Sequence, residues 1–264
     1  MMEAASRWHP DDYPRAALVT GAARRIGRAI ALELAREGWA VAVHYHGSAE
    51  AAAAAVGEIE AAGGRAVALK ADLAREAELA ELVPRATVAL GPLGCLVNNA
   101  SVFEPDTAAS ATRQSWDRHL ELNLRAPLVL TQEFARALPP DSGGVVINLL
   151  DQRIRNLTPY FLSYTVSKAG LWTLTQTLAL AFAPRIRVNG IGPGPALPSQ
   201  RQTAEQFEKQ CAMMPLGRGT SPEEICQAVR FILAAKAMTG EMIALDGGQH
   251  LGWAQPPQDD PAVE

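Results

Sequence analysis

The chain has 264 residues, of which 48% are hydrophobic and 20% charged, the composition of an ordinary globular protein with a sizeable core. A net charge of −4 gives no basic footprint for nucleic acid. No apolar run approaches the roughly 20 residues of a membrane span, and the first residues lack the apolar core of a signal peptide, so we expect a cytoplasmic protein that does not enter a membrane.

Cysteine usage points away from disulfides and metals. Cys95, Cys211 and Cys226 are widely spaced and odd in number, which fits neither a disulfide framework nor a zinc site. We expect all three to be buried as small apolar residues, and we expect no metal site.

Short apolar runs alternate with helical patterns along the chain. The runs predict buried strands at Ala16–Thr20, Trp39–Tyr45, Arg65–Lys70, Gly94–Asn98, Gly144–Leu150, Arg187–Ile191 and Met242–Leu245. Helical patterns lie between most of them, at Arg25–Glu37, Ala49–Ala62, Glu76–Leu90, Thr112–Ala137, Ser163–Ala183 and Pro222–Ala235. This alternation predicts an α/β fold with about seven parallel strands and helices on both faces. We expect a single domain over residues 16–252, with a flexible arm over 1–15 and a flexible tail over 253–264.

A glycine-containing turn follows the first predicted strand and opens the first predicted helix. It reads Thr20-Gly21-Ala22-Ala23-Arg24-Arg25-Ile26-Gly27. In that position backbone N–H groups and a helix N-terminus bind a pyrophosphate, which predicts a dinucleotide site.

The end of the second predicted strand indicates which dinucleotide binds. It reads His44-Tyr45-His46-Gly47-Ser48, where an NAD enzyme would place an acid for the ribose 2′-hydroxyl, and no acid occurs before Glu50. Arg24, His46 and Ser48 can instead bind a phosphate, so we predict NADPH as the cofactor.

A possible reacting centre lies later in the chain. Tyr164 and Lys168 are four residues apart on a predicted helix, where side chains are neighbours and the cation can lower the phenol's pKa. Such pairs also occur by chance, and Asp151, thirteen residues before Tyr164, could be a simple strand-end turn residue or a helix cap.

In combination these motifs resemble the short-chain dehydrogenase/reductase family over about residues 16–252, which implies a doubly wound Rossmann-type domain. The glycine turn is similar to that family's Thr-Gly-x-x-x-Gly-x-Gly, except that Arg25 replaces the middle glycine. Asp151 stands where the family normally has a serine that steadies a carbonyl oxygen. The resemblance further implies that Tyr164 relays a proton, Lys168 orients the nicotinamide ribose, Asn123 supports a water beside Lys168, and residues 195–219 form an irregular substrate lid.

Arg25, the His-Tyr-His segment, Ser101, Phe103 and Asp151 together resemble the pteridine reductases more narrowly, although those have a basic residue where this chain has Gly47. This resemblance implies reduction of a dihydrobiopterin- or dihydromonapterin-like pterin, by hydride transfer to a ring carbon and protonation of the adjacent nitrogen, in a homotetramer. The implied catalytic residues are Asp151, Tyr164, Lys168 and Asn123. The implied cofactor residues are Gly21, Arg24, Arg25, Ile26, Gly27, His44, Tyr45, His46, Ser48, Asp72, Leu73, Asn99, Ala100, Ser101, Tyr164, Lys168, Pro193 and Gly194. The implied substrate residues are Arg25, Ser101, Phe103, Asp151, Tyr164 and Gly194.

Plainer interpretations stay open beside these. Arg25 could be a solvated loop residue, Phe103 an apolar wall and Asp72 a helix cap. An ionised Asp151 would keep Tyr164 neutral, which suits a donor of protons to a ring nitrogen. The chain could also be a short-chain reductase of ketones, with Asp151 a local variation, or a non-catalytic NADP-binding sensor.

Overall fold

The structure, a computed structural model, describes residues 13–199 and 201–252. At its centre lies one parallel sheet in the order β3-β2-β1-β4-β5-β6-β7. The strands are β1 (Ala16–Val19), β2 (Ala40–Tyr45), β3 (Ala66–Lys70), β4 (Cys95–Asn98), β5 (Gly144–Leu149), β6 (Ile186–Pro193) and β7 (Met242–Leu245). The doubly wound α/β class predicted from the sequence is confirmed.

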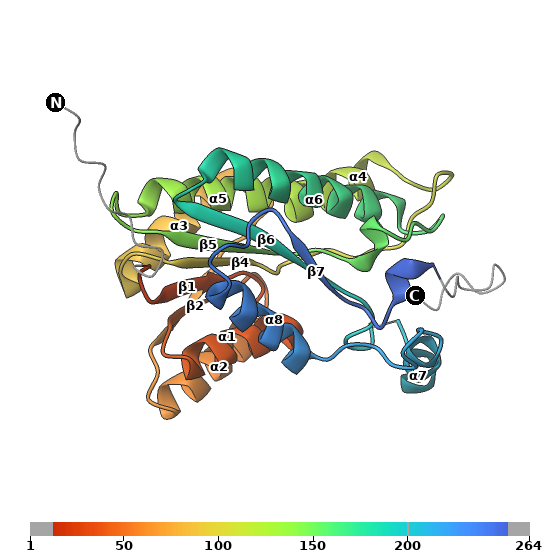
Figure 1. The fold of residues 1–264 in the computed structure, drawn as a ribbon, viewed down its shortest axis with the longest axis horizontal. Coiled ribbons are helices and arrows are strands. Elements are labelled where there is room, and N and C mark those ends of the chain that lie inside the picture. Colours follow the sequence, from red (N-terminus) through yellow and green to blue (C-terminus); the bar gives the residue numbers. More distant parts are fainter. Residues whose placement is uncertain (1–12, 200, 253–264) are drawn as a thin grey trace.

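Helices cover both faces of the sheet (Figure 1). On one face lie α1 (Arg25–Arg36), α2 (Ala49–Ala61) and α8 (Pro222–Ala234), and on the other lie α3 (Glu76–Leu90), α4 (Arg113–Leu120), α5 (Ala126–Ala137) and α6 (Leu162–Phe182). A large apolar cluster fills each layer. Because both faces of the sheet are covered, β1, β4 and β5 are buried along their whole length, which is why they read as continuous apolar runs.

Strand and helix bounds agree with the sequence prediction to within two residues, apart from two differences. The predicted helix Thr112–Ala137 is interrupted between α4 and α5 by a π-helical turn, Glu121–Arg125. The predicted irregular segment 195–219 contains a helix, α7 (Ala204–Ala212). Thr203 and Gln206 form a reciprocal capping box at its start, which explains why a helix forms there.

Two smaller expectations are also corrected. Tyr13, predicted to belong to a flexible arm, stacks on Trp39 at 6.3 Å between ring centroids and donates its hydroxyl to the Leu233 carbonyl. The rest of that arm, residues 1–12, and the tail, residues 253–264, lie outside the described residues. Cys95 and Cys226 are buried as predicted, whereas Cys211 on α7 is partly exposed.

The topology brings distant motifs to one edge of the sheet. The strand order reverses between β1 and β4, and in sheets of this kind ligands bind outside the carboxyl ends of the strands at such a switch point. Gly21 follows β1, Asn99 follows β4, Asp151 follows β5 and Gly194 follows β6. The residues expected to carry function therefore meet at this edge.

The core away from that edge provides a test of the fold. Phe134 on α5 is fully buried and packs over Gly144, where an added Cβ would lie 2.7 Å from its ring. We expect Phe134→Ala to lower the free energy of unfolding by about 3–5 kcal/mol, because it removes buried contacts and leaves a cavity. Chemical denaturation measures this change. Val88→Ala, at a side chain that is 89% exposed, is the control and should change the unfolding free energy by less than about 0.5 kcal/mol; equal effects would contradict the packing described.

Candidate active site

A hydrogen bond between Tyr164 and Asp151 lies at the centre of the site. The Tyr164 hydroxyl donates to Oδ2 of Asp151 at 2.7 Å. The other carboxylate oxygen, Oδ1, accepts from the backbone N–H of Arg153 at 2.9 Å and caps the 3₁₀ turn Gln152–Ile154. Asp151 is thus a cap, as the plainer interpretation held, and a partner of the phenol at the same time.

Burial and charge set the protonation states of Tyr164 and Lys168. Burial, followed by the negative charge and the hydrogen bond of Asp151, raises the pKa of Tyr164 well above its ordinary value. Burial lowers the pKa of Lys168 to about 8, although the charge of Asp151 opposes this. Lys168 Nζ donates to the Leu149 carbonyl at 2.7 Å and lies 5.7 Å from the centroid of the Tyr164 ring. At neutral pH the phenol is therefore neutral and the ammonium protonated.

Asn123 lies on the π-helical turn, a feature often found at functional sites. Its Oδ1 accepts from the Val102 N–H and the Ser101 hydroxyl, and its Nδ2 donates to the Val102 carbonyl and to Ser167 Oγ. The side chain therefore joins the segment after β4 to α6, beside Lys168.

An aromatic wall lies next to Tyr164. The rings of Phe103 and Phe161 stack with centroids 4.3 Å apart, and Phe103 meets Tyr164 edge-on at 4.7 Å. The guanidinium groups of Arg153 and Arg201 lie within 6 Å of both phenylalanine centroids. Phe161, Arg153 and Arg201 were not identified from the sequence. Phe161 lies before the predicted helix Ser163–Ala183 and takes a left-handed conformation at the start of α6, so no helical spacing indicated its contacts.

All six residues implied to contact substrate line one cavity of about 300 Å³, together with Lys168 and Pro193. A second cavity adjoins it and shares Arg25, Ile26, Asn99 and Ser101 with the first. The second cavity is also lined by most of the remaining residues implied to hold cofactor, namely Gly21, Arg24, Gly27, His44, His46, Asp72, Leu73 and Ala100. Tyr45, which packs against the core instead, and Ser48 line neither cavity.

The glycine turn has the shape that a dinucleotide pyrophosphate needs. Gly21 has φ +62°, and a Cβ on Gly27 would lie 2.4 Å from the Gly21 carbonyl oxygen, so the turn and α1 pack as closely as glycine allows. Arg24 at the start of α1 makes no side-chain cap, which leaves first-turn N–H groups directed toward the cavity available to a phosphate. Arg25 takes φ +55°, the left-handed conformation that a glycine would adopt more easily.

His44 supports this turn rather than offering a charge. Its Nδ1 accepts from the Gly21 N–H at 3.0 Å, and its Nε2 lies 3.1 Å from the Ala71 carbonyl, to which it donates. Burial lowers the pKa of His44 to about 4. It is therefore neutral and cannot give a phosphate a positive charge, whereas the guanidinium of Arg24 beside the second cavity can.

Asp72 forms a turn and does not cap the next helix, whose N-cap is Arg75, so the plainer interpretation of Asp72 is wrong. Its Oδ1 accepts from the Ala74 N–H, and its backbone N–H donates to Glu78. These bonds close the turn before α3, while the side chain of Asp72 lines the second cavity.

Comparison with known proteins agrees with this geometry. A family model described as enoyl-(acyl carrier protein) reductase matches residues 21–250. The 3-oxoacyl-(acyl-carrier-protein) reductase FabG of Staphylococcus epidermidis is 33% identical over 242 residues, covering 90% of this chain and 99% of that protein. The chain belongs to the short-chain dehydrogenase/reductase family.

Solved structures give a narrower likeness. FolM alternative dihydrofolate reductase 1 from Brucella suis, in complex with NADP, is 46% identical with a TM-score of 0.88, covering 92% of this chain and 97% of that one. A Serratia marcescens short-chain dehydrogenase/reductase variant is 34% identical with a TM-score of 0.83, covering 91% and 99%. In the described part of this chain no helix is long and apolar enough to cross a membrane. Nor do those residues contain a group of three or more His, Cys, Asp or Glu that could hold a metal ion.

The Tyr164 hydrogen bond leads to a spectroscopic test. Asp151→Asn removes a negative charge and a charged acceptor, so the pKa of Tyr164 should fall, but only partly because burial is the larger cause and stays. Phenolate absorbance, followed during titration and corrected with the Tyr164→Phe version of each protein, measures the change. An unaltered titration of Tyr164 would contradict the coupling of the pair.

Proposed function

We propose that this protein is an NADPH-dependent reductase of a dihydrobiopterin- or dihydromonapterin-like pterin. The observation that carries the proposal is the carboxylate of Asp151 bonded to Tyr164 at a position where the family normally has a serine. A carboxylate accepts hydrogen bonds from ring N–H groups and, when protonated, donates to a ring nitrogen, whereas a simple ketone requires only donors. The 46% identity to FolM supports the same substrate class.

NADPH, when bound, supplies the hydride, and the chain's residues manage the proton. Tyr164 donates a proton to the nitrogen adjacent to the reduced carbon. If Asp151 stayed ionised, this step would leave a phenolate beside a carboxylate, and like charges this close are strongly disfavoured. Tyr164 therefore has to regain a proton as it donates its own to the substrate. Lys168, with its pKa of about 8, is protonated at neutral pH and can supply that proton.

The second candidate is an NADPH-dependent reductase of carbonyl compounds, favoured by the likeness to FabG. Under that alternative Asp151 would be a local structural variation. Oxidation of NADPH with dihydropterins, dihydrofolate and a panel of ketones and 3-oxoacyl thioesters distinguishes the two. Turnover of carbonyl compounds without any turnover of pterins would overturn our proposal.

Asp151 provides the sharpest test of substrate class. Asp151→Ser restores the family's ordinary residue and Asp151→Asn keeps the shape without the charge. Both should lower dihydropterin turnover by roughly 10²–10⁴-fold, the usual range for general acid–base assistance, while NADPH still binds. Asp141→Asn, at an exposed aspartate before β5, is the control. If both Asp151 variants keep pterin rates within about twofold of the parent, Asp151 is only a turn residue.

Arg24 provides the test of cofactor choice. We expect the parent to prefer NADPH over NADH, and Arg24→Ala to weaken NADPH by about 10- to 100-fold while leaving NADH nearly unchanged, because only the 2′-phosphate loses a charged partner. Arg28→Ala, one turn along α1 and paired with Glu58, is the matched control. Fluorescence titration gives both dissociation constants; equal use of NADH by the parent would contradict the assignment.

A further inference from the structure

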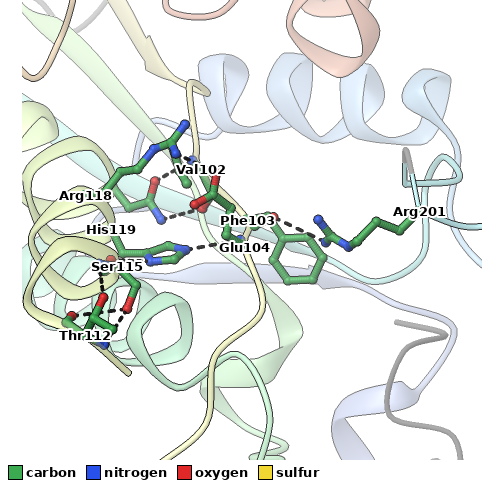
Figure 2. Close-up of polar contacts among 9 residues, drawn as sticks. Val102, Phe103, Glu104, Thr112, Ser115, Arg118, His119 and Arg201 are labelled. Carbon is green, nitrogen blue, oxygen red and sulfur yellow. Dashed lines mark hydrogen bonds and ion pairs between the residues drawn. The ribbon is translucent and has the colours of Figure 1, made fainter. Parts of the chain in front are cut away.

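A regular set of hydrogen bonds joins α4 and the π-helical turn to the segment that carries Phe103. Figure 2 shows the contact between His119 and Glu104 within this set. Ser115 Oγ donates to Asp106 Oδ2 at 3.0 Å. Nε2 of His119 accepts from the Glu104 N–H at 3.2 Å. Asn123 both accepts from the Val102 N–H and donates to the Val102 carbonyl. We call these three contacts the polar ladder.

The spacing of the polar ladder has a simple geometric origin. Its helical residues are four apart, which spans about 6 Å along a helix axis. Its partners on the other side are two apart, which spans about 6.6 Å of extended chain. The two rises nearly match, so successive contacts form in register, with residue 115 opposite 106, residue 119 opposite 104 and residue 123 opposite 102.

Alternation along the segment then directs Phe103 away from α4. Residues 101–106 form no helix, and in chain without helical turns neighbouring side chains can point to opposite sides. Glu104 pairs with Arg118 on α4, and the side chain of Asp106 also faces α4. Phe103 instead contacts Phe161 and Tyr164 on the cavity side, and its carbonyl accepts from Arg201.

His119 is the middle contact and is fully buried. A backbone N–H can only donate, so Nε2 must be unprotonated, and Nδ1 must then carry the proton that it donates to the Ser115 carbonyl at 2.8 Å. These two partners fix one neutral tautomer. The same set of bonds continues to the catalytic helix, because Asp106 also accepts from the N–H and hydroxyl of Ser163, the residue before Tyr164.

We propose that the polar ladder holds Phe103 in the position where the substrate ring stacks on it, and that His119 is the central positioning residue of the polar ladder. The inference rests on the proposed pterin reductase function and identifies what holds Phe103 beside Tyr164. Phe103 contributes mostly uniform binding to a flat heteroaromatic ring, so disturbing its position should act on KM more than on kcat.

Two substitutions of His119 separate the hydrogen bond from the bulk of the side chain. His119→Leu leaves the Glu104 N–H without its acceptor and should raise KM for a dihydropterin by about tenfold, with KM for NADPH and kcat within about twofold. His119→Gln offers a carbonyl oxygen near the place of Nε2 and should restore most of the pterin KM. Arg118→Gln, the matched control, removes only the partly exposed ion pair to the same Glu104 and should change little.

A double-mutant cycle tests whether His119 acts through Phe103. Phe103→Ala should itself raise the pterin KM, and adding His119→Leu to it should then cause no further rise beyond about twofold. Multiplicative effects of the two substitutions would overturn the proposal, because they would mean that His119 acts by another route.

Hydrogen exchange of the Val102 and Glu104 amides provides a readout that needs no substrate. Protection should fall in His119→Leu and persist in His119→Gln and Arg118→Gln. Unchanged protection in His119→Leu would overturn the polar ladder whatever the substrate is. If protection is lost as expected but the parent turns over no pterin, the proposed function is wrong, while the holding of this segment by His119 stands.

Discussion

The hydrogen bond from Tyr164 to Asp151 is the constraint to which the rest of the site is fitted. It requires a phenol on α6 and a carboxylate after β5 to meet in a buried place, where a second negative charge is not tolerated. The carboxylate is tolerated because its other oxygen takes a backbone N–H and because a protonated Lys168 lies nearby. The phenol of Tyr164 therefore keeps its proton and shares it with the carboxylate in a hydrogen bond of fixed geometry.

Parallel topology explains how so much of this could be predicted from sequence. The central strands are buried on both faces and so read as apolar runs. Each motif follows a strand, so that the motifs meet at one edge of the sheet. Two elements, the π-helical turn and α7, could not be predicted from the sequence, for physical reasons. The π-helical turn Glu121–Arg125 is only five residues long and lies between two helices, so the helical pattern around it does not reveal it. The short helix α7 is marked by its capping residues Thr203 and Gln206, in a segment otherwise rich in loop-forming residues.

The residues of the site also divide into those that a local sequence pattern predicts and those that it does not. Tyr164, Lys168 and the glycine turn are local patterns, so their spacing alone predicts their proximity. Phe161, Arg153 and His119 acquire their places from packing between segments that are distant in the chain, which no local pattern encodes. His44 illustrates the reverse case: its position beside the cofactor cavity was predicted, but burial and two backbone partners give it a supporting task.

Backbone strain connects the two halves of the site. Within the described chain, the non-glycine residues with positive φ are Arg25 and Phe161, and both line or flank the cavities. Such conformations cost on the order of 1–3 kcal/mol and persist only where surrounding contacts fix them. Arg25 is held by the Leu197 and Pro198 carbonyls at the start of segment 195–219, and Phe161 by its stack with Phe103. The strained turn at Arg25 depends on segment 195–219, and the strained start of α6 depends on the stack of Phe161 with Phe103. Because Arg25 lines both cavities, a change in segment 195–219 should alter the shape of both.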